Sequence, residues 1–329
     1  MDGENEQKLE ESFGDGHSAT SLTPADSIAI RRALTRLLRR RLKRFMVLAP
    51  EIRMDAHPKT IHDIRVWSRR LQQAISALFP KPRSGKVRRL RRTPRRVRRA
   101  LGEWRNCDVL LDLVARQQRR TQSEAKRRAW GFVHDYLLRK RAKEAGRAEK
   151  KLQFANLADY GALAQRLLGH MPEEAPEVLM RRLSESVEEG WTKWQSALSR
   201  AQETRALGDL HAFRVATKTL RYRTELLYDL GDQRLKGQLK CLAGLQNVLG
   251  VWHDRQVLAH AVAEAIAGVE TLLSELPTAR LLLGAVQAQR NRDAQYVEKI
   301  FRLAGEHSGS LQTQTWTEKS LVPQAQPLT

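Results

Sequence analysis

Two stretches, HDIRVWSRRLQ (residues 62–72) and HAFRVATKTLR (residues 211–221), follow one pattern, His-x-x-Arg-Val-x-x-basic-x-Leu or its close variant, 149 positions apart. A second pair, LGEWRNCDVLLDLV (101–114) and LGVWHDRQVLAHAV (249–262), is separated by 148 positions. Two different patterns recur in the same order at nearly the same separation. The sequence therefore predicts an internal duplication of a unit of about 130 residues.

The chain between its two ends is typical of helix throughout. Leu, Ala, Arg, Lys, Glu and Gln dominate, apolar residues recur every three or four positions, and no stretch alternates like a strand. Long helices with short connections predict an all-α fold of two antiparallel bundles of about four helices each. The helices are expected at 25–48, 58–79, 85–104, 106–144, 177–204, 208–230, 232–250, 252–273 and 278–304.

The domain organisation follows from this pattern. The first helical bundle is expected at 25–155 and the second at 177–304, and the glycines and prolines of 156–176 predict a linker between them. The acidic, polar segment 1–24 and the tail 305–329 are expected to be disordered.

The composition is strongly basic. The 329 residues include 59 Lys and Arg against 37 Asp and Glu, which gives a formal charge of +22. Such a charge attracts anions: nucleic acid, an acidic membrane surface or a phosphate polymer. The N-terminus does not resemble a signal peptide, and no apolar run reaches membrane-spanning length. Cys107 and Cys241 form neither a metal-spaced pair nor a disulfide framework, so we expect a cytoplasmic protein with buried thiols.

Each copy of the first pattern puts its basic residues on one face of a helix and its apolar residues on the opposite face. The basic face carries His62, Arg65 and Arg69 in the first copy, and His211, Arg214, Lys218 and Arg221 in the second. Each copy is therefore expected to pack one apolar face into its bundle and to present one basic face.

The stretch RRLRRTPRRVRRALGEWR (88–105) is even more basic. One face of this helix carries Arg88, Arg91, Arg92, Arg95 and Arg99. Like charges on one face repel each other, so an anion bound along the face would stabilise the helix. Pro94 predicts a break or kink within it. The second copy is less basic and keeps only Lys236 and Lys240 at matching positions.

Other chemistry has weaker support in the sequence. The histidines could be structural, metal ligands or phosphate donors, and no His-x-x-x-His or cysteine cluster favours a metal. Asp108, Asp112 and Asp254 could hold a metal or accept protons, but helix capping and pairing with arginine also explain them. No P-loop, dinucleotide fingerprint or nucleophile elbow occurs. We therefore expect a non-catalytic protein without a cofactor.

The repeated patterns resemble those of the CHAD domain, the conserved histidine α-helical domain. Its two histidine patterns match at His62, Arg65, Val66, Arg69, Arg70 and Leu71, and at His211, Arg214, Lys218, Arg221 and Tyr222. Its closing Leu-Gly pattern matches at Leu101, Gly102, Arg105, Asp108 and Val109, and in part at Leu249, Gly250, Asp254 and Val257. The resemblance covers about residues 25–304. The chain departs from it at Asn106, where the family usually has Asp, and at His253, which corresponds to Arg105.

The resemblance implies two four-helix bundles related by a pseudo-two-fold axis, with basic faces that line a central groove or pore. It also implies binding of inorganic polyphosphate and, in bacteria, association with polyphosphate granules. Many relatives carry a fused triphosphate tunnel domain that hydrolyses phosphates. Only a short acidic segment precedes Ala25 here, so hydrolysis is not expected. The expected polyphosphate-binding residues are His62, Arg65, Arg69, Arg88, Arg92, Arg95, Arg99, Arg105, His211, Arg214, Lys218, Arg221, Lys236, Lys240 and His253.

Nucleic acid is the alternative ligand. Proteins that bind single strands add exposed aromatic side chains for base stacking, whereas Trp67 and Trp104 fall on the apolar helix faces. Arginine forks and lysine charges on rigid helices suit a linear phosphate polymer without bases. We therefore expect inorganic polyphosphate as the partner, with other polyanions as alternatives and no membrane contact. The sequence leaves the oligomeric state open.

Overall fold

The computed structural model describes residues 24–79, 84–153, 157–169, 175–267 and 276–312. No strand occurs in these ranges, which confirms the all-α prediction. The helices are α1 (Pro24–Leu48), η1 (Ala49–Glu51), α2 (Pro58–Leu78), α3 (Gly85–Ala100), α4 (Gly102–Arg120), α5 (Glu124–Gln153), α6 (Leu157–Gly169), α7 (Pro176–Thr204), α8 (Leu207–Asp229), η2 (Gln233–Leu235), α9 (Lys236–Ile266), α11 (Leu276–Arg290) and α12 (Asp293–Gln312). None of them is long and apolar enough to cross a membrane.

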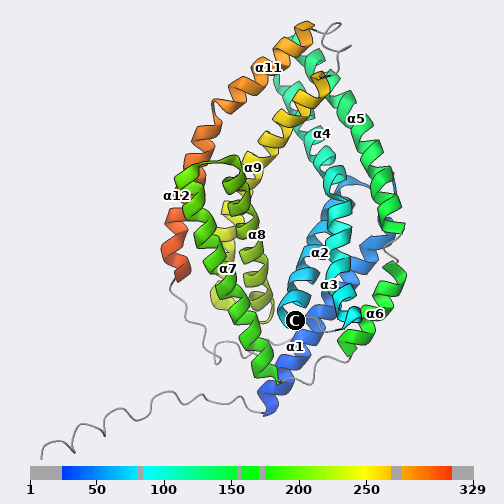
Figure 1. Cartoon of the computed structure of the whole chain (residues 1–329), viewed down its shortest axis with the longest axis vertical. Coiled ribbons are helices and arrows are strands. Elements are labelled where there is room, and N and C mark those ends of the chain that lie inside the picture. Colours follow the sequence, from blue (N-terminus) through cyan, green and yellow to red (C-terminus); the bar gives the residue numbers. More distant parts are fainter. Residues whose placement is uncertain (1–23, 80–83, 154–156, 170–174, 268–275, 313–329) are drawn as a thin grey trace, which may run out of the picture.

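The helices form two columns that meet at both ends (Figure 1). One column contains α1 to α6 and the other contains α7 to α12. Near α1, the helices α1 and α2 pack against α7 and α8, and at the far end α4 and α5 pack against α9 and α11. The internal duplication itself stays a prediction.

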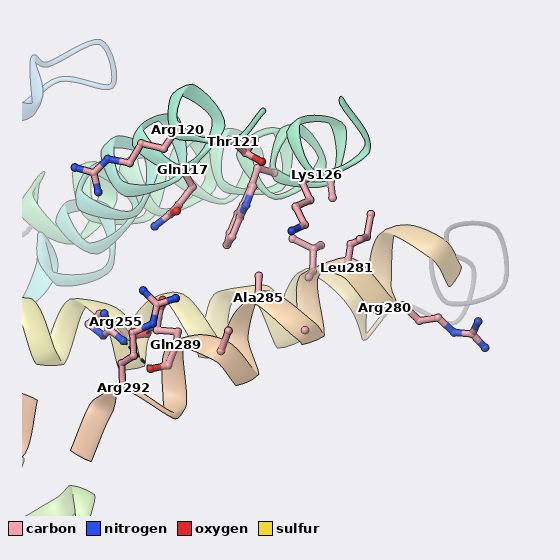
Figure 2. Close-up of a pocket in the computed structure, with 15 residues that line it drawn as sticks. Gln117, Arg120, Thr121, Lys126, Arg255, Arg280, Leu281, Ala285, Gln289 and Arg292 are labelled. Carbon is pink, nitrogen blue, oxygen red and sulfur yellow. Dashed lines mark hydrogen bonds between the residues drawn. The ribbon is translucent and has the colours of Figure 1, made fainter. Parts of the chain in front are cut away.

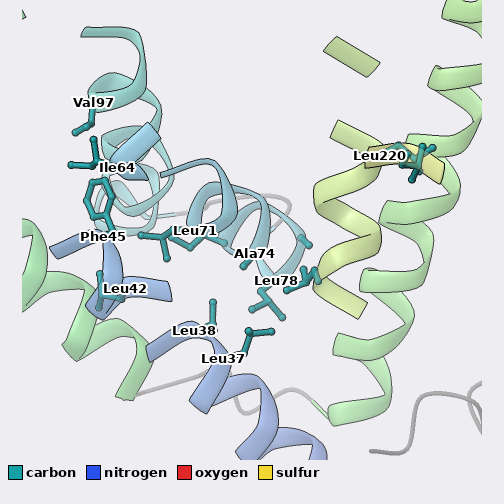
Figure 3. Close-up of a cluster of buried hydrophobic side chains, with 14 of the residues drawn as sticks. Leu37, Leu38, Leu42, Phe45, Ile64, Leu71, Ala74, Leu78, Val97 and Leu220 are labelled. Carbon is teal, nitrogen blue, oxygen red and sulfur yellow. The ribbon is translucent and has the colours of Figure 1, made fainter. Parts of the chain in front are cut away.

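The larger hydrophobic core lies at the end of the molecule near α1 and includes side chains from both columns. Apolar residues three and four positions apart on α1 and α2 form the stripes that meet there. Figure 3 shows part of this core, with labels on Leu37, Leu38, Leu42, Phe45, Ile64, Leu71, Ala74, Leu78, Val97 and Leu220. Because Leu220 belongs to α8 and the others to α1, α2 and α3, the two predicted bundles share one core at this end.

A second core joins the columns at the far end. It contains Val114 of α4 and Trp130 of α5, together with Val262 of α9 and Leu282 of α11. Lys140 of α5 also bonds Glu264 of α9 at this end. The two columns are therefore joined by two hydrophobic cores, one at each end. The repeated patterns lie on α2, α4, α8 and α9, the helices that run between these cores.

Several predicted helix boundaries are wrong. The expected helix 106–144 is interrupted at 121–123, where Thr121 has an extended backbone and Ser123 bonds the N–H of Lys126 at the start of α5. The expected helices 232–250 and 252–273 form one helix, α9, because nothing interrupts the hydrogen bonds near Leu249. In the first copy only Leu101 lies between the end of α3 and the start of α4. Its N–H still donates to the carbonyl of Val97.

The C-terminal predictions also change. The expected helix 278–304 is two helices, α11 and α12, which turn where Arg255 and Gln256 of α9 bond the carboxylate of Asp293. The expected disordered tail begins too early, since α12 continues to Gln312. Residues 1–23 and 313–329 lie outside the described ranges, so the remainder of that prediction is untested.

The predicted linker contains a helix, α6, that packs on α1 and α3. Pro94 lacks an N–H to bond the carbonyl of Leu90, and the hydroxyl of Tyr160 on α6 donates to that carbonyl at 3.3 Å. The bond therefore satisfies the carbonyl that Pro94 leaves free, and α3 continues through Pro94. Gly161 permits the close approach of α6, because a Cβ there would lie 2.9 Å from the terminal methyl of Met46.

Candidate functional site

Cationic side chains from both columns face one another between the two cores. We call this group the central basic cluster. It consists of His62, Arg65 and Arg69 of α2, Arg98 of α3, Arg105 of α4, His211, Arg214 and Lys218 of α8, and His253 of α9. Eight of these residues were predicted as site residues from the sequence, and the structure brings them together.

Electrostatic coupling between the columns shows that the two basic faces converge. Burial, followed by the charges of Arg69, Arg105 and Arg214, lowers the pKa of Arg65 to about 10. Burial, followed by the charges of Arg214, Arg69 and Arg65, lowers the pKa of Lys218 to about 7. Because α2 carries Arg65 and Arg69 while α8 carries Arg214 and Lys218, these effects act across the space between the columns.

The histidines of the cluster favour the neutral form. Burial and the charge of Arg105 lower the pKa of His62, and burial and nearby Arg214 lower that of His211. The pKa of His253 falls to about 3, chiefly through burial and then through Arg214 and His211, whose ring centroid lies 5.3 Å from that of His253. A neutral imidazole donates one hydrogen bond. In the described ranges no three His, Cys, Asp or Glu side chains are arranged to hold a metal ion.

Neighbouring groups orient two of the arginines. Arg65 donates to the main-chain carbonyl of Arg98 at 2.5 Å, and Arg98 donates to the side-chain oxygen of Gln72 at 2.5 Å. The guanidinium of Arg69 lies 5.6 Å from the ring centroid of Tyr222 on α8. These contacts hold Arg65 against α3 of its own column and Arg69 against α8 of the second column.

Arg98 is a cluster residue that the sequence prediction missed. Burial, then Arg69 and Arg65, lower its pKa to about 10. Its position seven residues after Arg91 puts it at the edge of the basic stripe on α3, and that spacing was the available signal.

The cluster contains few opposing charges. Asp254 of α9 is coupled to Arg214 and Lys218, but burial raises its pKa, and no described residue forms an ion pair with it. Asp108 instead bonds Arg141 of α5 at 2.7 Å, and Asp112 pairs with Arg116 at 2.7 Å. Pairing with arginine, one of the sequence-based explanations, is therefore confirmed for Asp108 and Asp112 but not for Asp254.

The remaining predicted site residues lie around the cluster or apart from it. The exposed residues are Arg88, Arg92, Arg95 and Arg99 on α3, and Lys236 and Lys240 on α9. Arg95 and Arg99 are coupled to Arg98 and so adjoin the cluster, whereas no described contact links the other four to it. Arg221 is already engaged, since it donates to Gln246 at 3.1 Å and lies 4.0 Å from Glu225.

Comparison with known proteins supports the fold. The crystal structure of the CHAD domain from the plant Ricinus communis is similar to this chain, with a TM-score of 0.60 and 21% sequence identity over 88% of this chain and 96% of that chain. At this identity the likeness concerns the fold. No curated protein matches the chain. The CHAD domain family model matches residues 36–263, which is more than half of the sequence, and the chain therefore belongs to the CHAD domain family.

Proposed function

We propose that the protein binds inorganic polyphosphate at the central basic cluster and does not hydrolyse it. One observation carries the proposal: partly buried cations from two columns face one another with little opposing charge. Within the described part of the chain, no ion pair or side-chain hydrogen bond engages Arg105, Arg214 or Lys218. Burying unpaired charge is unfavourable, so a polyanion between the columns would offset both the burial and the repulsion.

The chemistry of the cluster favours phosphate without bases. Guanidinium groups form paired hydrogen bonds with phosphate oxygens, and lysine adds a mobile positive charge. Tyr222 is buried beneath Arg69 and Arg221, Trp104 is fully buried, and Trp67 lies under Arg70. These rings are covered, so they do not offer the stacking surface by which proteins hold single-stranded nucleic acid.

The absence of turnover is part of the same proposal. Metal-assisted phosphoryl transfer uses carboxylates to hold the metal ions. Asp254 is the carboxylate coupled to both Arg214 and Lys218, and its surroundings are cationic. The CHAD family is also generally non-catalytic. We further propose that the protein resides in the cytoplasm and associates with polyphosphate granules, because the granules present the same polymer.

Titration with polyphosphates of defined length, at several salt concentrations, tests the proposal. Each phosphate contact should add roughly 0.7 to the magnitude of the log–log salt slope, by analogy with single-stranded nucleic acid. Replacement of Arg65, Arg69, Arg92 and Arg95 by Gln should weaken binding greatly and flatten this slope, while helicity stays unchanged.

A control variant, Arg32→Gln with Arg36→Gln on the exposed side of α1, removes charge away from the cluster and should bind almost normally. If the quadruple variant bound like the parent and the α1 variant lost affinity, the ligand would lie on α1 instead. Competition with DNA at one ionic strength tests the alternative ligand: stronger binding of DNA than of long-chain polyphosphate would overturn the proposal. Release of phosphate that survives purification and disappears with one point mutation would contradict the non-catalytic role.

A further inference from the structure

Two of the hollows outside the central basic cluster differ in their chemistry. One, of about 510 Å³, lies between the α4–α5 turn and α11 (Figure 2). Trp130 in its wall is a buried member of the second core, and the polar residues Gln117 and Gln289 also line it, so its chemistry indicates no particular ligand. The other, of about 670 Å³, lies between α1 and α6 and has a more apolar lining. We call it the lateral groove.

Apolar side chains and two cations line the lateral groove. The lining residues are Arg39, Leu42, Lys43, Met46 and Val47 of α1, with Gln165 and Leu168 of α6. Leu42 and Leu168 are buried members of the larger core, and Met46 packs against that core but is only partly buried. Val47 is 59% exposed. Apolar surface of Met46 and Val47 therefore faces water, which favours an apolar contact there.

The two cations of the lateral groove face no carboxylate in the part of the chain that the structure describes. No Asp or Glu lines the groove, and no ion pair or side-chain hydrogen bond with a described residue engages Arg39 or Lys43. Both side chains are exposed. Because Arg39, Lys43 and Val47 follow one another at intervals of four positions, they share one side of α1. The groove therefore suits a ligand that carries carboxylates beside apolar groups.

The chain itself contains such a segment before α1. Residues 1–23 lie outside the described ranges, and they include six Asp and Glu against one Lys. In the stretch EQKLEESF (residues 6–13), Leu9 and Phe13 are four positions apart, and two glutamates lie between them. A polar segment that cannot form a core of its own can still bind where a groove supplies the apolar contact. The charges and apolar groups of this stretch are complementary to those of the groove.

The length of chain between this stretch and α1 allows it to reach the lateral groove. Lys43 lies 19 positions after Pro24, the first residue of α1, which corresponds to about 28 Å along the helix. Phe13 lies 11 positions before Pro24, and this length of chain spans about 36 Å when it is extended. The stretch can therefore fold back along α1, with Leu9 further along the helix than Phe13.

We propose that residues 6–13 dock in the lateral groove of the same chain. The two apolar side chains of the stretch cover the exposed apolar surface of the groove, and its glutamates pair with Arg39 and Lys43. Because the stretch is tethered to α1, its effective concentration at the groove is of the order of millimolar, so a weak contact is sufficient. This docking does not depend on polyphosphate binding at the central basic cluster.

Carbodiimide coupling of the full chain tests the docking, because the reagent joins a carboxylate directly to a lysine amine that contacts it. Mass spectrometry of peptides from the monomer should find Glu6, Glu10 or Glu11 joined to Lys43. Lys236, an exposed lysine on α9, is the matched control and should be joined at least tenfold less often. Coupling that is absent at Lys43, or equal at Lys43 and Lys236, would overturn the proposal. Coupling found only in a cross-linked dimer would overturn it in favour of docking on a second copy.

Two variants separate docking from general attraction between charges. Leu9→Ser with Phe13→Ser keeps every charge and should reduce the coupling to Lys43 at least tenfold. Val47→Asp removes exposed apolar surface from the groove and repels the glutamates, so it should reduce the coupling by a similar factor. Its matched control is Ile28→Asp, because Ile28 is 53% exposed on α1 but does not line the groove. This control should change the coupling by less than twofold.

Circular dichroism melting checks that the two aspartate variants remain folded. The serine variant changes only residues before α1, so it tests the docking even if Val47→Asp fails to fold. Unchanged coupling to Lys43 in the serine variant would show that charge alone brings the segment to α1, and the docking would be wrong. An equal loss in Ile28→Asp and Val47→Asp would contradict it as well, since only Val47 lines the groove.

Discussion

Arg69 and Arg70 are neighbours on α2, yet they face opposite electrostatic surroundings. The Nε atom of Arg70 lies 2.5 Å from a carboxylate oxygen of Glu225 on α8, where the two columns join. Arg69 instead faces Lys218, which lies on α8 like Glu225. The charge along one side of α8 thus changes from positive at Lys218 to negative at Glu225 and Asp229, with the ring of Tyr222 between them.

This contrast separates two uses of arginine in one basic protein. At the joint between the columns, carboxylates neutralise arginines and fix the helices relative to one another. Arg41 is the extreme case, since it is fully buried and lies 2.8 Å from Asp229. In the central basic cluster the cations lack such partners and are available to an external anion. Changes at the joint should therefore affect stability, and changes in the cluster should affect binding.

The largest expected effect is on stability. Asp229→Ala leaves the buried guanidinium of Arg41 without its carboxylate and should lower the free energy of unfolding by about 3 kcal/mol, as for other broken buried pairs. Chemical denaturation measures this change. The matched control is Asp55→Ala, because the Arg53–Asp55 pair is exposed and should contribute less than about 1 kcal/mol. Equal effects of the two changes would show that Arg41 finds another partner.

The next largest effect is on polyphosphate binding. It compares mutations in the central basic cluster with mutations of the exposed arginines on α3. Arg65→Gln with Arg69→Gln should weaken polyphosphate binding by about 100-fold or more, since hydrogen bonds to charged groups contribute roughly 1.5–3 kcal/mol each. Arg92→Gln with Arg95→Gln removes the same charge from exposed positions and should cost about tenfold or less. Titration at one salt concentration compares the two variants. If the exposed pair lost more polyphosphate affinity than the cluster pair, the principal binding site would lie on α3.

Binding should also depend on pH. The lowered pKa of Lys218, about 7, leaves this amine partly neutral near pH 7, and a bound polyanion would raise its pKa again. Binding then takes up a proton, so affinity should fall as pH rises above about 7, by up to tenfold per pH unit while one proton is taken up. Arg65, Arg69 and Arg214 oppose the charge of Lys218, and Asp254 favours it.

Calorimetry in buffers of different ionisation enthalpy measures this proton uptake near pH 8. Lys218→Arg keeps the positive charge but replaces the amine that titrates near pH 7. Proton uptake on polyphosphate binding by this variant should therefore be close to zero. Equal uptake by the parent and Lys218→Arg would assign the proton to another group.

The smallest effect tests a difference between the two copies. Asp254 occupies the position that corresponds to Asn106, so only the second copy places a carboxylate there. Asp254→Asn removes a negative charge that acts on Arg214 and Lys218, and it should raise polyphosphate affinity about fivefold, or about 1 kcal/mol. The same titration should show a loss for Asn106→Asp. An unchanged affinity in both variants would place the polymer away from this part of the cluster.

The two predicted copies also share one contact, an arginine–glutamine hydrogen bond, in which the two residue types have exchanged positions. In the first copy Arg98 of α3 donates to Gln72 of α2, whereas in the second Arg221 of α8 donates to Gln246 of α9. The arginine therefore belongs to opposite helices of the matching pairs. Helical periodicity could not show this exchange, because it assigns each side chain to a face but does not identify the neighbour on the next helix.

The all-helical class and the basic faces of α2 and α8 were predictable from the sequence. Helix geometry is local: a spacing of three or four residues puts His62, Arg65 and Arg69 on one face whatever surrounds the helix. The repeated patterns likewise indicated which faces correspond. The sequence did not predict the helix α6 within the expected linker, where Tyr160 contacts the distant carbonyl that Pro94 leaves free.

By itself, then, the sequence determined the all-helical class, the faces that carry charge and the family resemblance, because each depends on residues close together in the chain. The tertiary structure decided which cations remain unpaired. Arg70 and Arg41 are neutralised by Glu225 and Asp229, more than 150 positions away, while Arg65 and Lys218 face other cations. A side chain's charge is a local property, but its partner and its exposure to water are set by the packing of distant helices.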